Sequence, residues 1–251
     1  MKALLLLLFV SMTSMASAQV YPGVYYNLRE ARENINICTV LLQAGGNKKK
    51  AAPSICRLVN LEMLDFQKNE LDSIPSCIGT MGSLKNLYLS SNKMKKFPES
   101  VCGSTSLELL ALDNNQIVSV PNEIGNVSTL KILYIGHDKL TSLPEEIGSL
   151  SNLKVLEMNG NDITTLPSSM KKLSKLEYLI LDGTKISNLN EILPSLKNLK
   201  LLSIGGTYGT SPEEMAALKA ALPKGCILNP VKEQIEAAGH VSGYVFPKIR
   251  D

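Results

Sequence analysis

Residues 130–152 read LKILYIGHDKLTSLPEEIGSLSN, and this stretch is one unit of a repeat that runs through the middle of the chain. Successive units begin 23 residues apart without a slip, and each opens with a leucine: Leu61, Leu84, Leu107, Leu130, Leu153, Leu176 and Leu199. A fixed period of this length predicts a solenoid, because a single unit cannot bury its apolar face alone and needs stacked neighbours.

Within the unit, apolar residues fall at positions 1, 4, 6, 11, 14, 18 and 21. The step from position 4 to position 6 is typical of a strand. Position 9 is asparagine in most units, and an amide that both donates and accepts can satisfy backbone groups of neighbouring units in a ladder. Asp138 and Thr184 replace it in two units, where we expect weaker rungs. Position 15 holds a proline in five units, which fixes φ on the wall opposite the strands.

The pattern L-x-x-L-x-L-x-x-N-x-L resembles the leucine-rich repeat family over roughly Thr39 to Thr207. Its L-P-x-x-I-G continuation is similar to the 23-residue subclass found in scribble-type scaffolds, plant Ras-group repeat proteins and bacterial surface proteins. The resemblance implies an α/β fold: a curved horseshoe solenoid with a parallel β-sheet on its concave face, closed by helical caps.

The ends of the chain divide it into four expected parts. Residues 1–18 have a charged start, an apolar run and an A-x-A site before Gln19, which predicts a cleaved signal peptide. Residues 19–60 read as an N-terminal cap, with a helix over 25–36, and a degenerate 22-residue repeat from Thr39. Residues 61–207 hold the regular repeats. Residues 208–251 read as a C-terminal cap, with helices from Ser211 and over 231–238 and a short strand at 226–228.

These features indicate a secreted, cell-surface or periplasmic protein. The apolar run of the signal is too short to span a bilayer, and no other stretch qualifies. The formal charge is +3 and falls to +2 without Lys2, too near neutral to indicate nucleic acid or anionic lipid as a partner. Asn126 lies in a glycosylation sequon that matters only in a eukaryotic host.

Five cysteines in an exported chain permit disulfides. Cys56 and Cys102 lie in the same column two repeats apart, about 10 Å by the strand spacing, which is too far for a bridge. Cys77 lies between them and could reach one of the two. The alternative is that these cysteines are small buried apolar residues.

A ligand-binding surface is expected at positions 3, 5, 7 and 8, which face the concave side. Leu109, Ile132, Val155 and Tyr178 form an apolar column on a face that should be open to water, and Tyr88 and Tyr134 flank a gap at Ala111. Asp113, Asn159 and Asp182 lie along one side. Apolar groups rimmed by polar ones are typical of a binding patch, although strand propensity alone could place them there. The candidate contact residues are Tyr88, Leu109, Asp113, Ile132, Tyr134, Val155, Glu157 and Tyr178.

The glycines that fill positions 7 and 8 from Gly136 onward have two explanations. A ligand backbone could approach closely there, or the turn could simply favour glycine, and the second explanation is preferred.

These observations favour a non-catalytic protein that binds a protein or peptide partner. A carbohydrate or cell-wall module is an alternative, because Tyr88 and Tyr134 could stack on sugar rings. A second alternative is an exported effector with its activity in the caps.

Catalysis, metals and cofactors are not expected. Ser91 and His137 lie two repeats apart, about 10 Å by the strand spacing, where proton transfer needs roughly 3 Å. Asp113, His137 and Asp138 lack the paired spacing of a metal site.

Overall fold

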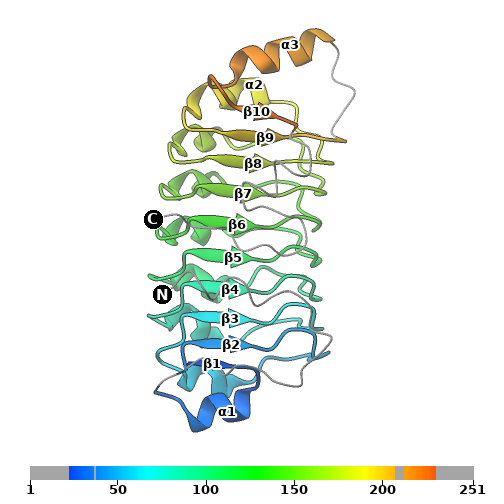
Figure 1. Ribbon diagram of the computed structural model, residues 1–251. Coiled ribbons are helices and arrows are strands. Elements are labelled where there is room, and N and C mark those ends of the chain that lie inside the picture. The colour runs from blue at the N-terminus through cyan, green and yellow to red at the C-terminus, as the bar shows by residue number, and fades with distance from the viewer. Residues whose placement is uncertain (1–22, 37, 207–211, 230–251) are drawn as a thin grey trace. The chain divides into compact units, whose positions relative to one another are not determined.

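The computed structural model describes residues 23–36, 38–206 and 212–229 of the 251-residue chain. Within these residues, ten parallel strands form one open sheet, in which each strand pairs with the next along the chain (Figure 1). The strands are β1 (Val24–Tyr25), β2 (Val40–Leu42), β3 (Met63–Asp65), β4 (Asn86–Tyr88), β5 (Leu109–Ala111), β6 (Ile132–Tyr134), β7 (Val155–Glu157), β8 (Tyr178–Ile180), β9 (Leu201–Ser203) and β10 (Ile227–Leu228).

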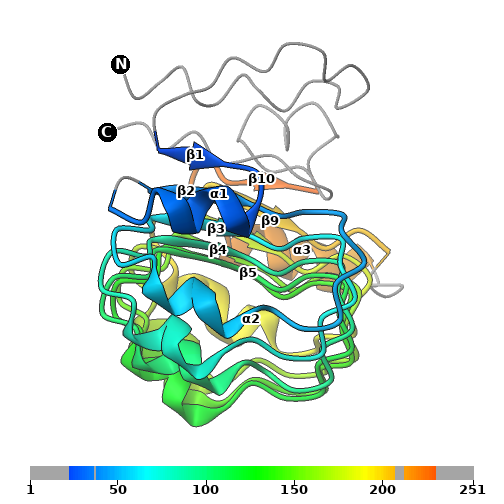
Figure 2. The ribbon, with the colours of Figure 1, turned by 90° about the horizontal axis from the view of Figure 1, so that it is seen from below.

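Short 3₁₀ helices lie on the side of the stack opposite the strands (Figure 2), and an α-helix lies at each of its two ends (Figure 1). The α-helices are α1 (Leu28–Glu33), α2 (Leu189–Ile192) and α3 (Pro212–Ala221), and the 3₁₀ helices are η2 (Pro53–Arg57), η3 (Ser76–Thr80), η4 (Glu99–Gly103), η5 (Asn122–Asn126), η6 (Glu145–Ser149), η7 (Ser168–Lys172) and η8 (Leu193–Ser195). The position 15 prolines immediately precede η3 to η7. Where Asn190 replaces proline, the chain forms α2 instead.

The strand register reproduces the 23-residue period. Leu133 in the middle of β6 pairs with Leu110 on β5 and Leu156 on β7, and all three are fully buried. Their side chains, together with those at position 6, fill the space between the strands and the helices and form one continuous core. The predicted solenoid with a parallel sheet is therefore confirmed.

The predicted asparagine ladder is present. Asn161 is 3 % exposed; its Nδ2 donates to Ile135 O at 2.8 Å and Met158 O at 3.0 Å, and its Oδ1 accepts from Leu140 N at 3.1 Å. Asp138 keeps only the bond from Ile117 N, at 2.8 Å, and its Oδ2 is buried without a partner. Thr184 Oγ1 donates to Leu181 O. Both substituted rungs thus have fewer hydrogen bonds than Asn161, as predicted.

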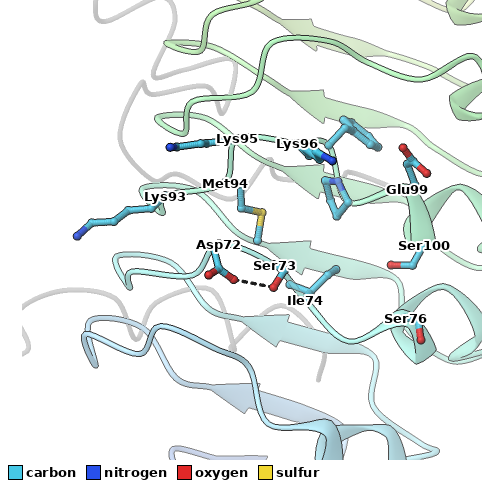
Figure 3. A pocket seen from close by; sticks show the side chains of 12 residues that line it. Asp72, Ser73, Ile74, Ser76, Lys93, Met94, Lys95, Lys96, Glu99 and Ser100 are labelled. Atoms are coloured by element: carbon cyan, nitrogen blue, oxygen red, sulfur yellow. Dashed lines mark hydrogen bonds between the residues drawn. The ribbon is translucent and has the colours of Figure 1, made fainter.

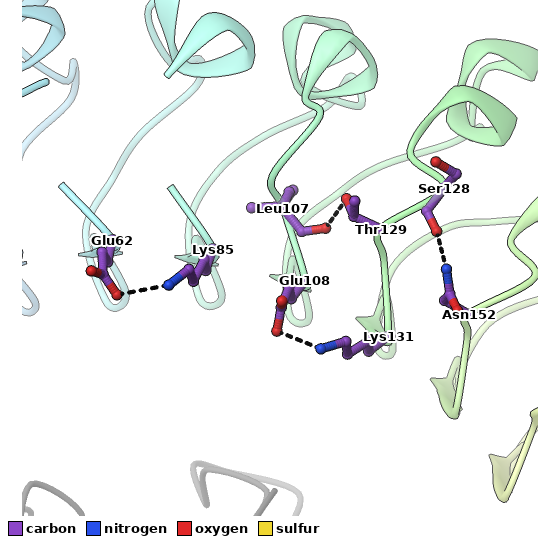
Figure 4. A network of polar contacts seen from close by, with 8 residues as sticks. All are labelled: Glu62, Lys85, Leu107, Glu108, Ser128, Thr129, Lys131 and Asn152. Atoms are coloured by element: carbon purple, nitrogen blue, oxygen red, sulfur yellow. Dashed lines mark hydrogen bonds and ion pairs between the residues drawn. The ribbon is translucent and has the colours of Figure 1, made fainter. Parts of the chain in front are cut away.

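Charged residues fill position 2, beside the strands, and those from Glu62 to Lys131 alternate in sign (Figure 4). Glu62 pairs with Lys85 at 3.1 Å and Glu108 pairs with Lys131 at 2.9 Å, each across one repeat. These side chains are partly exposed, so each pair is worth about 0–1 kcal/mol. Their contribution is to favour the 23-residue register.

The first repeat begins one residue earlier than predicted. Leu41, not Leu42, pairs with Leu64 and is fully buried, which puts the start of the repeat at Cys38 and gives it the full 23 residues. The prediction of a 22-residue unit from Thr39 is wrong. Cys38 takes the place of the opening leucine as a small buried apolar residue, and Gln43 stands at position 6, so the pattern was hidden.

The predicted N-terminal helix is present but shorter. Val24 and Tyr25 form a strand that pairs with β2. Asn27 caps α1 by accepting from Glu30 N at 2.9 Å, so the helix begins at Leu28. The prediction of a helix from Tyr25 is therefore wrong, because the local cap and the strand pairing fix its start.

The C-terminal elements match the prediction where the structure describes them. In α3, Leu218 is 5 % exposed and joins the core, and Met215 and Leu222 pack against it. The strand expected at 226–228 is β10, which pairs with β9. The expected signal peptide at residues 1–18, the Ser211 helix cap and the helix over 231–238 lie outside the described residues.

One disulfide joins Cys56 to Cys77, with a Cα–Cα distance of 5.8 Å. It links η2 and η3, the neighbouring helical turns that carry these residues. Cys38 and Cys102 are buried free thiols. The sequence had left open which neighbour Cys77 would reach, and it is Cys56.

Candidate ligand-binding face

The side of the sheet turned away from the core carries the side chains at positions 3, 5 and 7, and we call this surface the strand face. It follows from strand alternation: Leu133 points into the core, so Ile132 and Tyr134 beside it point to the opposite side. The strand register aligns equivalent positions of successive repeats, so Tyr88, Ala111, Tyr134 and Glu157 form one row across β4 to β7.

The apolar column of the strand face is buried. Leu109, Ile132 and Val155 are 2 %, 3 % and 4 % exposed, and Tyr178 is half-buried. The prediction that this column is open to water is therefore wrong. Neighbouring strands hold its members about 4.8 Å apart, so each side chain covers part of the next. None of these three residues belongs to the core cluster, so they form a second apolar layer.

The row of aromatic residues is also more enclosed than predicted. Tyr88 is 6 % exposed and Ala111 is 3 % exposed, so the expected gap between the rings is not open to water. Tyr134 is half-buried. Burial raises the pKa of both tyrosine hydroxyls, and nearby acidic residues add to the rise.

Position 7 carries two carboxylates that each accept from a backbone amide of the next repeat and from a serine hydroxyl. Asp113 accepts from Gly136 N at 3.0 Å and from Ser90 Oγ at 3.1 Å. Asp182 accepts from Gly205 N at 2.6 Å and from Ser203 Oγ at 2.8 Å. Burial raises the pKa of Asp113 to about 6, against the opposing effect of these donors. The predicted line of Asp113, Asn159 and Asp182 along one side is confirmed.

On the strand face, the carboxylate of Glu157 is buried with fewer hydrogen bonds than those of Asp113 and Asp182. Glu157 is 7 % exposed, and no hydrogen bond or ion pair joins its side chain to a described residue. Burial raises the pKa of Glu157 to about 8, and the charges of Asp113 and Asp182 add to the rise.

Two further residues of this surface were not among the sequence candidates. Asp65 is 2 % exposed and pairs in register with Tyr88; burial raises its pKa to about 6. Asn159 is 7 % exposed, and its Nδ2 lies 3.0 Å from His137 Nε2. An amide nitrogen only donates, so His137 Nε2 is the acceptor. The signal that could have pointed to Asp65 is a charged residue at position 5, which occurs only there and at Glu157 in the regular repeats.

The position 8 glycines are explained by the turn rather than by a ligand. His137 has φ +53° and Gly160 has φ +64°, and the other repeats also adopt the left-handed conformation at position 8. Glycine takes this conformation without strain. The preferred explanation from the sequence is therefore confirmed for position 8; Gly136 and Gly205 at position 7 do not have a left-handed backbone.

The residues considered for catalysis and metal binding have other partners. Asp113 accepts from Gly136 N, Asp138 accepts from Ile117 N, and His137 bonds Asn159. Among the described residues, no three His, Cys, Asp or Glu side chains are placed to hold a metal ion.

A groove of about 570 Å³ lies on another part of the surface, between the loops that follow β3 and β4 (Figure 3). Ile74, Met94 and Phe97 supply its apolar lining, and Lys96 and Glu99 lie at its edge. It is open and holds charges of both signs, so it favours no class of ligand as clearly as the strand face does.

No helix in the parts of the chain that the structure describes is long and apolar enough to cross a membrane.

Comparisons with known proteins give one family match. A family profile described as a leucine-rich repeat region matches residues 122–220. No curated protein sequence matches the chain.

Solved structures share the fold. A leucine-rich repeat protein of Leptospira interrogans is 27 % identical, with a TM-score of 0.65, over 81 % of this chain and 57 % of that one. The ectodomain of the Arabidopsis thaliana receptor kinase GASSHO1/SCHENGEN3, in complex with CASPARIAN STRIP INTEGRITY FACTOR 2, is 27 % identical, with a TM-score of 0.61, over 73 % and 23 %. Internalin C2 of Listeria monocytogenes is 23 % identical, with a TM-score of 0.65, over 79 % and 82 %, and shows the fold alone. The chain thus spans little more than half of the Leptospira protein and about a quarter of the receptor ectodomain.

Proposed function

Since the chain is a leucine-rich repeat protein, we propose that it is a non-catalytic binding protein whose strand face recognises a protein or peptide partner. The observation that carries this proposal is the pair of half-buried rings on the strand face, Tyr134 and Tyr178, which lie outside the core on a face that also carries Asp113, Glu157 and Asp182. Aromatic side chains on a face that the fold does not use for its core, with charged groups on the same face, have the composition of an interface.

The solved structures support the class of partner. The plant ectodomain was solved in complex with an integrity factor, and a second plant receptor, 26 % identical, is described as a peptide hormone receptor in complex with RGF2. In this chain, Tyr134 and Tyr178 are half-buried beside the apolar layer. Aromatic side chains in such a setting supply much of the binding free energy of interfaces.

The carbohydrate alternative is less well supported. Stacking on a sugar needs an exposed ring face, and Tyr88 is only 6 % exposed. The alternative of an effector with activity in the caps rests on residues 208–251, of which 212–229 are described. In these residues, Leu218 of α3 joins the core and β10 pairs with β9, so both elements continue the stack.

Export is part of the proposal. The signal pattern at residues 1–18 supports delivery outside the cytosol, and so does the Cys56–Cys77 disulfide, because such bonds persist in oxidising compartments. Intact-mass analysis of the protein made from the full sequence should find Gln19 as its first residue. A mature chain that begins at Met1 would contradict this part of the proposal.

The binding test compares variants on two surfaces. Full-length protein, its Tyr134→Ala/Tyr178→Ala variant and a Val59→Ala/Val118→Ala control would each be offered a cell-surface extract. Val59 and Val118 are 61 % and 55 % exposed and do not belong to the strand face, so the control removes apolar area elsewhere. Circular dichroism would check that all three are folded. A protein captured by the wild type and the control, but not by the tyrosine variant, is the expected result; equal capture by all three would contradict a strand-face site.

A further inference from the structure

Arginine is rare in this chain, and the fold gathers most of it at one place. Of the 26 basic residues only four are arginines, and the rest are lysines. Three of the four, Arg29, Arg32 and Arg57, line a single pocket of about 340 Å³ together with Glu33 and Ile35. Arginine differs from lysine in its planar fork of five donors, so this concentration indicates a site that uses the fork.

The pocket is built by α1 and η2 at the end of the stack next to β1, where Figure 1 shows α1. Leu28 and Ala31 turn one side of α1 toward the core. Arg29 and Arg32 are three residues apart in this helix, so their side chains are neighbours along its exposed side. Arg57 is the last residue of η2, which packs against α1. The fold thus brings together arginines that lie 25 residues or more apart in the chain.

The backbone on both sides of the pocket is held in place. Asn27 caps α1 by accepting from Glu30 N at 2.9 Å. In η2, Cys56 immediately precedes Arg57 and is joined to Cys77 by the disulfide. A site whose backbone is fixed in advance loses less conformational entropy when a ligand binds.

The pocket carries an excess of positive charge. Its three guanidinium groups face one carboxylate, which leaves a net charge of +2. Arg29 Nε lies 3.5 Å from Glu33 Oε1, but both side chains are largely exposed to water, so this ion pair is weak. The ion pairs of the described residues include neither Arg32 nor Arg57. Two of the three guanidinium groups are therefore available to an anion from outside.

Shielding the end of the stack does not account for the choice of arginine. Long basic side chains can cover apolar surface with their stems, and Ile35 in this pocket is half-buried. Lysine has such a stem as well. On η7, for example, Lys171 and Lys172 are exposed at a helical turn that η2 resembles. What lysine lacks is a fork that donates two parallel hydrogen bonds to one oxyanion.

We propose that Arg29, Arg32 and Arg57 bind a phosphate group, either as free phosphate or as a monoester on a larger molecule. A phosphate monoester carries close to two negative charges at neutral pH, which matches the excess charge of the pocket. Its three terminal oxygens can accept from several guanidinium forks at once. A carboxylate offers one charge and two oxygens and would leave part of the pocket unpaired. The volume lies in the range of small-ligand sites, so the pocket has room for part of the molecule that carries the phosphate.

The test measures the binding of inorganic phosphate, glycerol 1-phosphate and acetate to the full-length protein by isothermal titration calorimetry, at about 0.15 M ionic strength. Arg32→Gln/Arg57→Gln removes two charges from the pocket, and Arg32→Lys/Arg57→Lys keeps the charges but not the forks. Lys171→Gln/Lys172→Gln is the matched control, because it removes two charges from exposed positions of η7. Circular dichroism would check that every variant is folded.

The wild type and the η7 control should bind at least one of the two phosphates saturably, and at least about tenfold more tightly than acetate. The glutamine variant should bind it at least about tenfold more weakly than the wild type, and the lysine variant at least about threefold more weakly. Tighter binding of glycerol 1-phosphate would assign the site to a phosphorylated molecule, and tighter binding of inorganic phosphate would assign it to the free ion.

Two results would overturn the inference: no binding of either phosphate, or equal affinity in the wild type and in a folded arginine variant. Neither would touch the proposed function, because the pocket shares no residue with the strand face.

Discussion

The two sides of the sheet differ in how they use the same strands. The inner side repeats almost without variation: a leucine in the middle of each strand from β2 to β9, and a buried asparagine or its substitute at position 9, where Asn161 has all its side-chain groups bonded within the fold. The strand face varies from repeat to repeat and contains Glu157, a buried carboxylate without a partner among the described residues. The regular side holds the stack together, and the irregular side carries what is particular to this protein.

The largest expected effect separates two adjacent residues on opposite sides of β6. Leu133→Ala should lower the free energy of unfolding by roughly 3–5 kcal/mol, because it leaves a cavity in a core that cannot collapse around it. Ile132→Ala should cost about half as much, because its layer lies outside the core. Denaturant unfolding of both variants measures the difference; equal losses would show that the strand face is as structural as the core.

The next effect concerns the ladder on the inner side. Asn161→Ala removes three hydrogen bonds and leaves Leu140 N without this acceptor. We expect a loss of about 2–3 kcal/mol. The control is Asn122→Ala, which changes the same residue type at an exposed position of η5. A loss below about 0.5 kcal/mol for Asn161→Ala would contradict the role given to the ladder.

On the strand face, a substitution at Glu157 is expected to raise the free energy of unfolding, whereas the inner-side substitutions lower it. The pKa of Glu157 is raised to about 8 in the fold, so its ionisation opposes folding: the wild type loses stability as pH rises from about 4.5 through about 8. The groups that face it are Tyr134, Ile180, Asp113 and Asp182. Glu157→Gln does not titrate, so it should match the wild type near pH 4 and exceed it by on the order of 2 kcal/mol near pH 9. Thermal unfolding at both pH values measures this; a glutamine variant less stable than the wild type at pH 9 would refute it.

The smallest effect tests Asp138, one of the two position 9 residues that replace asparagine on the inner side. Burial raises the pKa of Asp138 to about 7, so the protonated form is favoured in the fold and stability falls as pH rises from about 4 through 7. Asp138→Asn supplies an amide donor like that of Asn161 and should add about 1 kcal/mol above pH 7, with little gain near pH 4. A gain that does not depend on pH would mean that packing, rather than the charge, sets the strength of this rung.

The sequence predicted the inner side because a 23-residue period leaves little freedom at positions 4, 6 and 9. It missed the register of the first repeat, because Cys38 stands where every later repeat has leucine. It failed on the exposure of Leu109, Ile132 and Val155, because the burial of a strand-face side chain depends on its neighbours and not on its own repeat. It placed Glu157 among the candidates but could not show that Asp113 and Asp182 act on it, since this depends on distances across three strands.

The most direct test of a binding strand face is to measure the dissociation constant of a captured partner for two double variants. Isothermal titration calorimetry would compare wild type with Tyr134→Ala/Tyr178→Ala and with Val59→Ala/Val118→Ala. The account predicts at least about 30-fold weaker binding for the tyrosine variant and less than about twofold change for the valine variant. Unchanged affinity of the folded tyrosine variant, with loss in the valine variant, would contradict the account and move the site off the strand face.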